Sequence, residues 1–263
     1  MDKEKNLKKG AGAISGRIWV LISFLLALVV LQLLSVLPST SIVFSSPVKI
    51  VQSFLAKSAD GTIWMNIGMS LFRVVIGFLL GFVISIPIAF LMSWYKVFRN
   101  LVEPWIQFIR NIPPLAYIPL VIAGVGVGES AKVVVIFIAT FLVNVITVYQ
   151  GIRDVDVTLI KAARVLGAND RDVFLKVIIP ASIPFLLVGM RLGLSTALTT
   201  LIAAEMTGAS SGLGMMITSA GEYYDMSTVV MGIIVIGIIG LTFEQIVKFL
   251  ERKLTSWQET RVM

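Results

Sequence analysis

The chain has no cysteine and no histidine, and only 14% of its 263 residues are charged. The missing residue types exclude disulfides, thiolate nucleophiles, cysteine–histidine zinc clusters and imidazole acid–base catalysis. An ordinary soluble domain carries about 25% charged residues, whereas this chain is 57% hydrophobic with a mean hydropathy of +0.94. No G-x-x-x-x-G-K-[ST] string occurs, so the cluster Gly124, Gly126, Gly128 predicts no nucleotide site. The composition indicates a non-enzymatic protein of the lipid bilayer.

Uncharged intervals predict about six membrane crossings, because each crossing needs about 20 apolar residues. The expected fold class is all-α, a polytopic membrane protein. The predicted spans are 18–37, 74–95, 104–123, 133–152, 181–204 and 226–243, with Pro38 ending the first. The predicted organisation is a tail at 1–17, the first helix and an outer connection at 18–64, a transmembrane domain at 65–250 with an inner loop at 151–179, and a tail at 251–263.

Lysine and arginine gather in the segments that would lie in the cytoplasm, whereas the outer segments keep Lys49, Lys57 and, at an edge, Lys132. Basic residues near helix ends are retained in the cytoplasm, so both termini are expected there. The formal charge of +7 predicts no nucleic-acid partner, because it flanks apolar runs instead of forming one soluble face. The first apolar stretch is too long for a signal peptide and is expected to stay as a helix. A short outer helix is expected to start at Ser45-Ser46-Pro47.

The connection 151–179 is much longer than the 2–8 residues that usually join bundle helices, so it is expected to hold structure of its own. Local signals predict two short helices, with a cap at Asp154 or Asp156, an elbow at Gly167, a second start at Asn169 or Asp170 and a stop at Pro180.

Both short helices would present apolar side chains, ringed by basic residues. The apolar residues are Leu159, Ile160, Ala163 and Leu166 in the first helix and Val173, Phe174, Val177 and Ile178 in the second, and the basic ones are Lys161, Arg164, Arg171 and Lys176. Such a pair is either a docking element for a soluble protein or an amphipathic pair lying on anionic lipid. Composition supports both equally.

The string KAARVLGANDRDVFLKVIIP resembles the EAA loop of bacterial ABC importer permeases, whose pattern is E-A-A, three residues, G, and a proline-terminated close. Two residues depart from the pattern. Ile179 replaces the usual leucine conservatively. Lys161 stands at the acidic position, so a salt bridge from the family's glutamate does not carry over. In that family the loop inserts into a groove of the ATPase subunit. The resemblance implies ATPase-coupling roles for Lys161, Ala162, Ala163, Leu166, Gly167, Asp170, Phe174 and Pro180.

The stretches SLFRVVIGFLLGFVISIPIA, RNIPPLAYIPL with GVGVGESAKV, and MRLGLSTALTTLIAAEMTGASSGLGMMI are similar to the nitrate/sulfonate/taurine branch of these permeases. The resemblance implies a type I ABC importer transmembrane fold in the bacterial inner membrane. It implies a homodimer, a cytoplasmic ATPase that carries ATP and magnesium, and an extracytoplasmic substrate-binding protein, with no cofactor on this chain. The implied solutes are sulfonates, taurine, nitrate, bicarbonate, aromatic carboxylates or thiamine-precursor pyrimidines.

Ionisable residues in apolar spans usually face the bundle interior, where they pair or line a pathway. The candidates for an anion pathway are Arg73, Arg110, Arg191 and Glu205, with a gate at Pro113 and Pro114 in the segment from Arg110 to Pro119. Alternatively, Arg73 reaches the outer interface, Arg191 pairs with Glu205 or a backbone carbonyl, and the prolines only kink the third span.

Two other function classes remain open at the sequence level. A secondary transporter or channel would need no ATPase, but it would favour mid-membrane carboxylates and inverted repeats, and only Glu205 fits. A membrane scaffold would use the inner loop to recruit a soluble protein without transport.

Overall fold

The computed structural model describes residues 16–37, 40 and 43–255, and every regular element within them is helical. The predicted tails fall largely outside the described residues, as does Pro38. The helices are α2 (Gly16–Val36), α3 (Pro47–Ala59), α4 (Thr62–Trp94), α5 (Lys96–Arg110), α6 (Pro114–Val125), α7 (Glu129–Arg153), α8 (Val157–Val165), α9 (Asp170–Asp172), the π-helix η1 (Val173–Ile178), α10 (Ile179–Met206), α11 (Leu213–Glu222) and α12 (Met226–Leu254).

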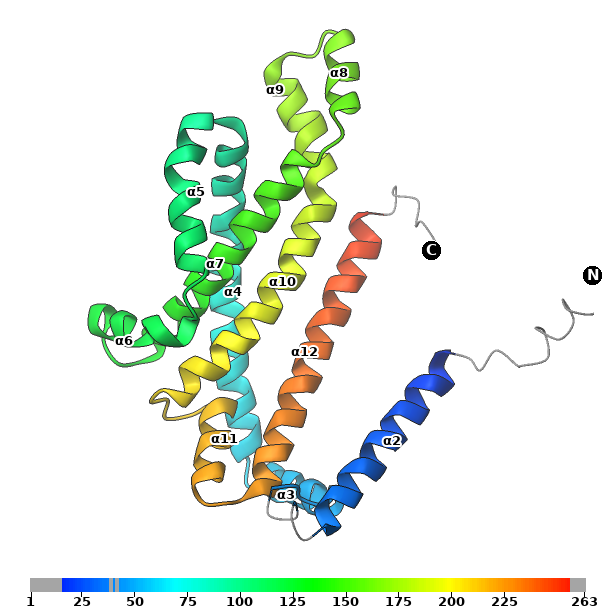
Figure 1. The fold of residues 1–263 in the computed structure, drawn as a ribbon, viewed down its shortest axis with the longest axis vertical. Helices are drawn as coiled ribbons and strands as arrows, with labels where there is room; N and C mark the ends of the chain where they lie inside the picture. The colour runs from blue at the N-terminus through cyan, green and yellow to red at the C-terminus, as the bar shows by residue number, and fades with distance from the viewer. Residues whose placement is uncertain (1–15, 38–39, 41–42, 256–263) are drawn as a thin grey trace, which may run out of the picture.

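Four stretches in the described part are long and apolar enough to cross a membrane: α4, α7, α12 and the continuous helix Asp170–Met206 that ends in α10. The predicted second, fourth, fifth and sixth spans lie within these helices. The α2 helix, predicted as the first span, is also apolar, and its C-terminal end leads through α3 to α4 (Figure 1). As predicted, α3 starts with Ser46 at its N-cap and Pro47 in its first turn.

The predicted third span at 104–123 is broken at its prolines, where irregular backbone or a kink was expected. The chain there forms α5 and α6, which are bent by 107° at the break between Arg110 and Pro114. Pro114 has no amide hydrogen to continue the ladder of α5, and Pro113 disfavours the α conformation in the residue before it. The α5–α6 pair is therefore one broken crossing or a re-entrant segment.

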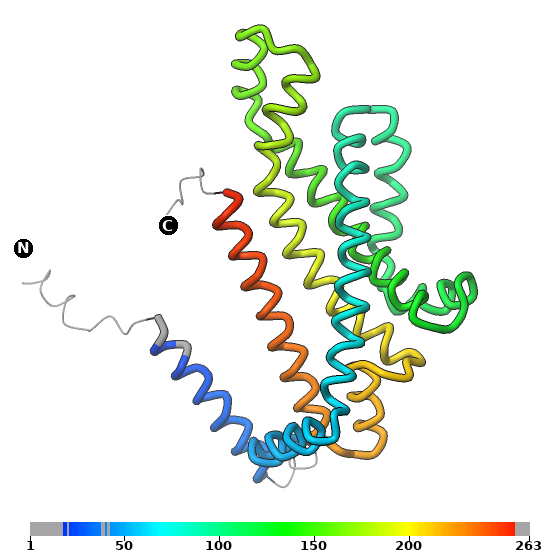
Figure 2. Tube along the Cα trace, turned by 180° about the vertical axis from the view of Figure 1, so that it is seen from behind, coloured from blue at the N-terminus to red at the C-terminus, as the bar shows by residue number. Residues whose placement is uncertain are grey.

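The α7 helix forms the centre of the bundle and packs between α4 and α10 (Figure 2). Close approach depends on small residues: a Cβ at Gly81 of α4 would lie 2.9 Å from the Phe137 carbonyl oxygen of α7. On the other side, a Cβ at Gly193 of α10 would lie 2.5 Å from the Asn144 amide nitrogen. Small residues at helix contacts are typical of membrane bundles, where backbone proximity maximises dispersion contacts.

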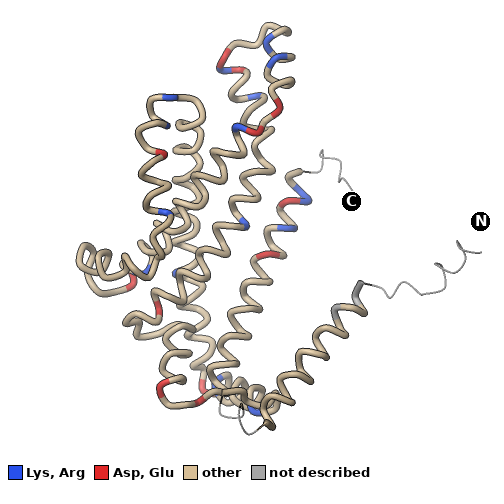
Figure 3. Tube along the Cα trace, in the orientation of Figure 1, with Lys and Arg blue, Asp and Glu red and all other residues tan. Residues whose placement is uncertain are grey.

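The two ends of the molecule differ in structure and charge. The α8–α9 pair projects beyond the bundle at one end, and α3 and α11 cover the other (Figure 1). Figure 3 shows lysine and arginine around α8, α9 and the last turns of α12, with long uncharged stretches between the two ends. The helix α12 ends, and α2 begins, on the side of α8–α9.

Candidate functional site

The predicted pair of short helices is present, and we refer to residues 156–178 as the knob. The Asp156 carboxylate accepts a hydrogen bond from the Thr158 amide at 2.8 Å and caps α8. This backbone hydrogen bond lowers the pKa of Asp156, so the cap is ionised at neutral pH. Gly167 ends α8 with a φ of +87°, a conformation that other residues adopt only with strain. Asn169 then caps α9 by accepting from the Asp172 amide at 2.8 Å.

The crest of the knob is an exposed apolar pair within a charged surround. Val165 and Leu166 are 88% and 87% exposed, the highest values among large apolar residues of the described chain. Lys161 and Ala162 are exposed on the same helix, and Arg164 pairs with Asp170 across the elbow at 3.0 Å. Sequence reasoning missed Val165, because the helical pattern of apolar residues placed it off the expected face.

The second half of the knob faces the bundle. Val173 and Ile178 are buried, and the Phe174 ring makes edge contacts with Phe90 and Trp94 of α4, with centroids 5.4 Å and 5.1 Å apart. Ile160 and Ala163 pack against the same cluster from α8. The expectation that the apolar face of the second helix is presented outward was wrong, because the end of α4 covers it. Phe174 therefore anchors the knob, while Leu166 and its neighbours stay accessible.

Pro180 does not close the second helix, contrary to the prediction. The chain continues from Asp170 to Met206 as one helix. Pro180 lies in the first turn of α10, directly after the π-helical turns Val173–Ile178. A π-turn changes the hydrogen-bond register, which lets a helix continue past a residue without an amide hydrogen. The knob is thus continuous with a membrane-spanning helix.

Arg73 lies at the centre of a charge network near the end of the bundle that α11 covers. Its side chain is fully buried; Nη1 lies 2.6 Å from Glu205 Oε1 and Nη2 lies 2.8 Å from Glu129 Oε1. Lys132 Nζ lies 3.1 Å from the same Glu129 Oε1. The alternatives that Arg73 reaches the interface and that Arg191 pairs with Glu205 were both wrong. Arg73 and Glu205 instead neutralise each other.

The same network holds the loop before α11. Arg73 donates to the Ser211 carbonyl at 2.7 Å. Ser70 donates to Glu205 at 2.8 Å and accepts from the Leu213 amide at 2.9 Å. The Gly214 amide donates to Glu205 Oε2 at 2.8 Å. The sequence analysis missed Glu129 and Ser70. Both residues lie just outside the predicted spans, and nothing near them in the sequence indicates their partners.

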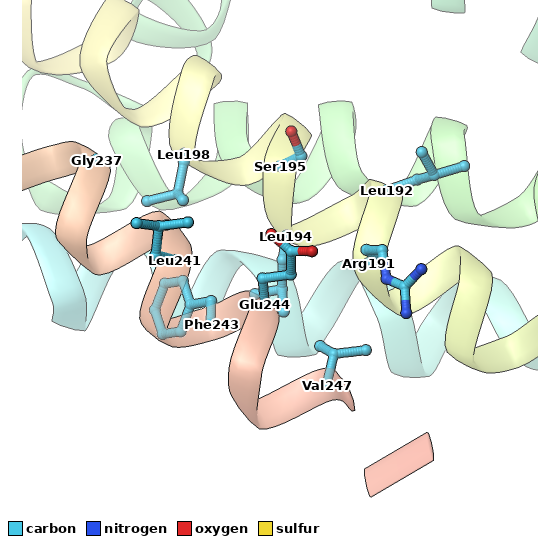
Figure 4. Close-up of a pocket in the computed structure, with 11 residues that line it drawn as sticks. Arg191, Leu192, Leu194, Ser195, Leu198, Gly237, Leu241, Phe243, Glu244 and Val247 are labelled. Atoms are coloured by element: carbon cyan, nitrogen blue, oxygen red, sulfur yellow. The ribbon is translucent and has the colours of Figure 1, made fainter. Parts of the chain in front are cut away.

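Arg191 lies on α10 in a cavity of about 500 Å³ between α10 and α12 (Figure 4). Its Nη2 forms an ion pair with Glu251 Oε2 of α12 at 2.6 Å. Glu244, on the same cavity wall, pairs with Lys248 at 2.7 Å. The remaining lining is mostly apolar, including Leu198 and Phe243 in the labelled view. Arg191 is therefore engaged by a carboxylate in this conformation.

Arg110 and the two prolines lie together at the bend between α5 and α6. Arg110 is the last residue of α5, and Pro113 caps α6, which Pro114 begins. Arg110 and Pro113 are exposed, and Arg110 forms no ion pair with any described residue. The structure thus separates the predicted pathway residues into the Arg73–Glu205 pair, Arg191 with Glu251, and Arg110 at the bend.

A family model described as the binding-protein-dependent transport system inner membrane component matches residues 74–256. The chain belongs to this family. The match runs from the middle of α4 to the end of α12 and includes the knob, so the resemblance inferred from the EAA-like string is confirmed.

Curated members of the family are similar over most of their length. A "Probable ABC transporter permease protein" of Brucella abortus is 48% identical over 83% of this chain and 88% of its own length. The taurine transport system permease protein of Escherichia coli is 36% identical over 75% of this chain and 72% of its own. The nitrate import permease protein of Leptolyngbya laminosa is 28% identical over 78% of this chain and 76% of its own.

Solved ABC transporters share the fold of this family member. The inward-facing methionine ABC transporter superposes with a TM-score of 0.66 at 22% identity, over 73% of this chain and 97% of that one. An amino acid ABC transporter gives a TM-score of 0.63 at 21% identity, over 76% of this chain and 96% of that one. The expected type I importer transmembrane fold is confirmed.

Proposed function

We propose that this permease forms the pathway of an ATP-driven importer for a small anionic solute and couples to a cytoplasmic ATPase through the crest of the knob. The observation that carries the coupling is the crest itself. Val165 and Leu166 are almost fully exposed on a segment anchored to the bundle by Phe174. An exposed apolar pair on a rigid support favours a protein contact, because water and lipid head groups solvate it poorly.

The anchoring also favours docking over a lipid-bound helix pair. A pair lying on lipid would direct its whole apolar face to the membrane. Here the apolar residues Val173 and Ile178 face the bundle, and the crest is the most exposed apolar part of the knob, ahead of Val157, Leu159 and Leu175 at 56%, 50% and 46%. The family positions Ala162 and Gly167 lie at this crest, while Lys161 presents a cation where the family pattern has an acid.

The proposed solute class depends on the solutes of the relatives and on the arginines within the bundle. Relatives that transport taurine and nitrate are 36% and 28% identical. The proposal also includes sulfonates, bicarbonate, aromatic carboxylates and thiamine-precursor pyrimidines. The partners we propose are a second copy of the chain, a cytoplasmic ATPase that holds ATP and magnesium, and an extracytoplasmic binding protein. In the proposed orientation, the knob and both termini are cytoplasmic in a bacterial inner membrane.

A secondary transporter fits the buried charges less well. An ion-coupled mechanism needs a mid-membrane carboxylate that can gain and lose a proton or cation. Glu205 is fully buried and held by Arg73, Ser70 and the Gly214 amide. Both oxygens of this carboxylate are already engaged by protein donors, which leaves no free position for a coupling ion.

Co-purification with an ATPase tests the coupling. The Leu166→Asp variant is expected to retain less than about a tenth of the ATPase that the parent chain brings down from detergent, because a charge at a desolvated contact costs more than about 1.4 kcal/mol. The matched control is Tyr223→Asp, since Tyr223 is 82% exposed at the opposite end of the molecule. Full ATPase retention by Leu166→Asp would overturn the coupling role.

A further inference from the structure

The α5 helix carries a continuous polar face along its length. Its polar residues recur every three or four positions, which places them on one side of a helix. Most are exposed, and the Arg99 and Glu103 side chains are 26% and 30% exposed. The residues of this polar face are Lys96, Arg99, Asn100, Glu103, Gln107, Arg110 and Asn111.

The other two sides of α5 are apolar and serve different contacts. One packs against the bundle through Ile106, which is 4% exposed, with Val102 and Ile109 beside it. The other presents Leu101 and Trp105, which are 70% and 66% exposed. A helix meant only for lipid and protein would be apolar on all sides. A separate polar side indicates that α5 also contacts water.

The polar face reaches into the depth of the bilayer. The α5 helix starts directly after α4 and runs back alongside it (Figure 2). Arg110 follows Lys96 by 14 positions of this helix, which is about 21 Å at a rise of 1.5 Å per residue. A hydrocarbon layer is about 30 Å thick, so a helix that starts at its inner boundary places Arg110 well inside. An arginine facing lipid there costs about 2.5–3.5 kcal/mol.

Arg110 forms no ion pair and no side-chain hydrogen bond with a described residue, so its guanidinium donors are free; in Arg191 one donor, the buried Nε, also has no partner. Arg73 is saturated by Glu129 and Glu205, and Arg191 is paired with Glu251. On α5 itself, Glu103 is engaged by Gln107, which donates to it at 3.1 Å. A guanidinium offers a planar fork that fits two oxygens of a sulfonate, nitrate or carboxylate.

We propose that the polar face of α5 lines a water-filled route and that Arg110 is its anion-contacting residue. The inference deepens the proposed function, on which it rests, by assigning the solute contact to one helix. The bend after Arg110, with Pro113 and Pro114, fixes the depth at which the guanidinium lies.

Charged thiol reagents test the route without knowledge of the natural solute, because the chain has no native cysteine. The transporter with its ATPase, in proteoliposomes, is labelled with the anionic sulfonatoethyl methanethiosulfonate and its cationic trimethylammonium analogue. Gln107→Cys lies on the polar face; Leu101→Cys on the exposed apolar side of the same helix is the matched control. We expect Gln107→Cys to react at least about ten times faster with the anionic reagent than Leu101→Cys does.

The role of Arg110 is tested in the Gln107→Cys background. Adding Arg110→Gln is expected to lower the anionic-to-cationic rate ratio about tenfold, and Arg110→Lys to lower it less. Equal reactivity of Gln107→Cys and Leu101→Cys would overturn the route, and an unchanged ratio in Arg110→Gln would overturn the role of Arg110. Neither result bears on ATPase retention by Leu166→Asp, so failure here is distinguishable from failure of the coupling proposal.

Discussion

The guanidinium of Arg73 connects three helices and a loop through direct bonds to protein atoms. It lies between Glu129 of α7 and Glu205 of α10, and it also donates to the Ser211 carbonyl. Burying such charges is costly unless every group is paired, and removing one partner leaves the others uncompensated. The contribution of Arg73 is therefore to keep the fully buried Glu205 carboxylate stable and to link it to Glu129, whose side chain is 40% exposed.

Replacing Arg73 with methionine is expected to destabilise the protein by about 3–5 kcal/mol, because Glu205 keeps its burial and loses its charge partner. The measurement is the thermal unfolding midpoint of the detergent-solubilised protein. Arg99→Met is the control, since the Arg99–Glu103 pair is long, at 4.0 Å, and partly exposed; such pairs contribute about 0–1 kcal/mol. Equal midpoints for both variants would show that the network is not a stabilising unit.

At this scale the sequence identified which charges lie in the membrane but not their partners. Arg73, Arg191 and Glu205 are recognisable because they interrupt apolar spans. Their partners depend on how helices far apart in sequence converge, and that geometry has no local signal. Glu129, at the first turn of α7, was missed for this reason.

Among the elements, α7 depends most on close approach to its neighbours. Gly81 of α4 faces its backbone, and a Cβ there would lie 2.9 Å from the Phe137 carbonyl oxygen. Backbone cannot move aside as a flexible side chain can. The α4–α7 contact therefore requires glycine at position 81.

Gly81→Ala is expected to destabilise the protein by about 1–3 kcal/mol, because α4 and α7 must separate to admit the methyl group. Unfolding by temperature or denaturant in detergent measures the change. Gly68→Ala on the same helix is the control: a Cβ there meets nothing within 4 Å, so the gain in helix propensity of about 0.5–1 kcal/mol is unopposed. A Gly81→Ala protein as stable as Gly68→Ala would contradict the close contact.

Elements with local signals were predicted well, and those shaped by tertiary contacts were not. Asp156, Gly167 and Asn169 set the caps and elbow of the knob, as expected from their residue types. The sharp bend in the third span was not predicted, because hydropathy averages over the break that Pro113 and Pro114 introduce. Pro180 failed as a stop because π-helical turns carry the helix past it.

For the whole molecule, the distribution of basic residues predicts which end faces the cytoplasm. Lysine and arginine of α8, α9 and the last turns of α12 lie toward one end, and α3 lies at the other (Figure 3). Because such residues are retained in the cytoplasm, that end is the inner one in the proposed orientation.

Single cysteines on this cysteine-free chain test the orientation directly. Arg252→Cys, exposed near the end of α12, is expected to react with a membrane-impermeant maleimide only after the membrane is opened. Ala59→Cys, exposed at the end of α3, is expected to react in intact spheroplasts. The unsubstituted chain provides the background. The opposite labelling pattern would show that the proposed orientation is wrong and that the knob lies outside the cell, where no cytosolic ATPase can reach it.

The membrane class, the helical fold and the family could be read from the sequence, because uncharged intervals and the knob motif are local properties. The depth and direction of each polar face could not. Only residues 104–110 of α5 were placed in the predicted third span, and the separation of its polar residues from Leu101 and Trp105 became visible with its bend and packing.

The unbroken helix from Asp170 to Met206 has a mechanical consequence. Its 37 residues extend about 55 Å at 1.5 Å per residue, with the elbow at Gly167 close to its first residue and Glu205 close to its last. A rigid rod transmits a tilt imposed at one end to the other as displacement. Any movement of the crest that pivots this rod strains the ion pair between Glu205 and Arg73. The knob and the loop that Arg73 holds before α11 are therefore mechanically coupled.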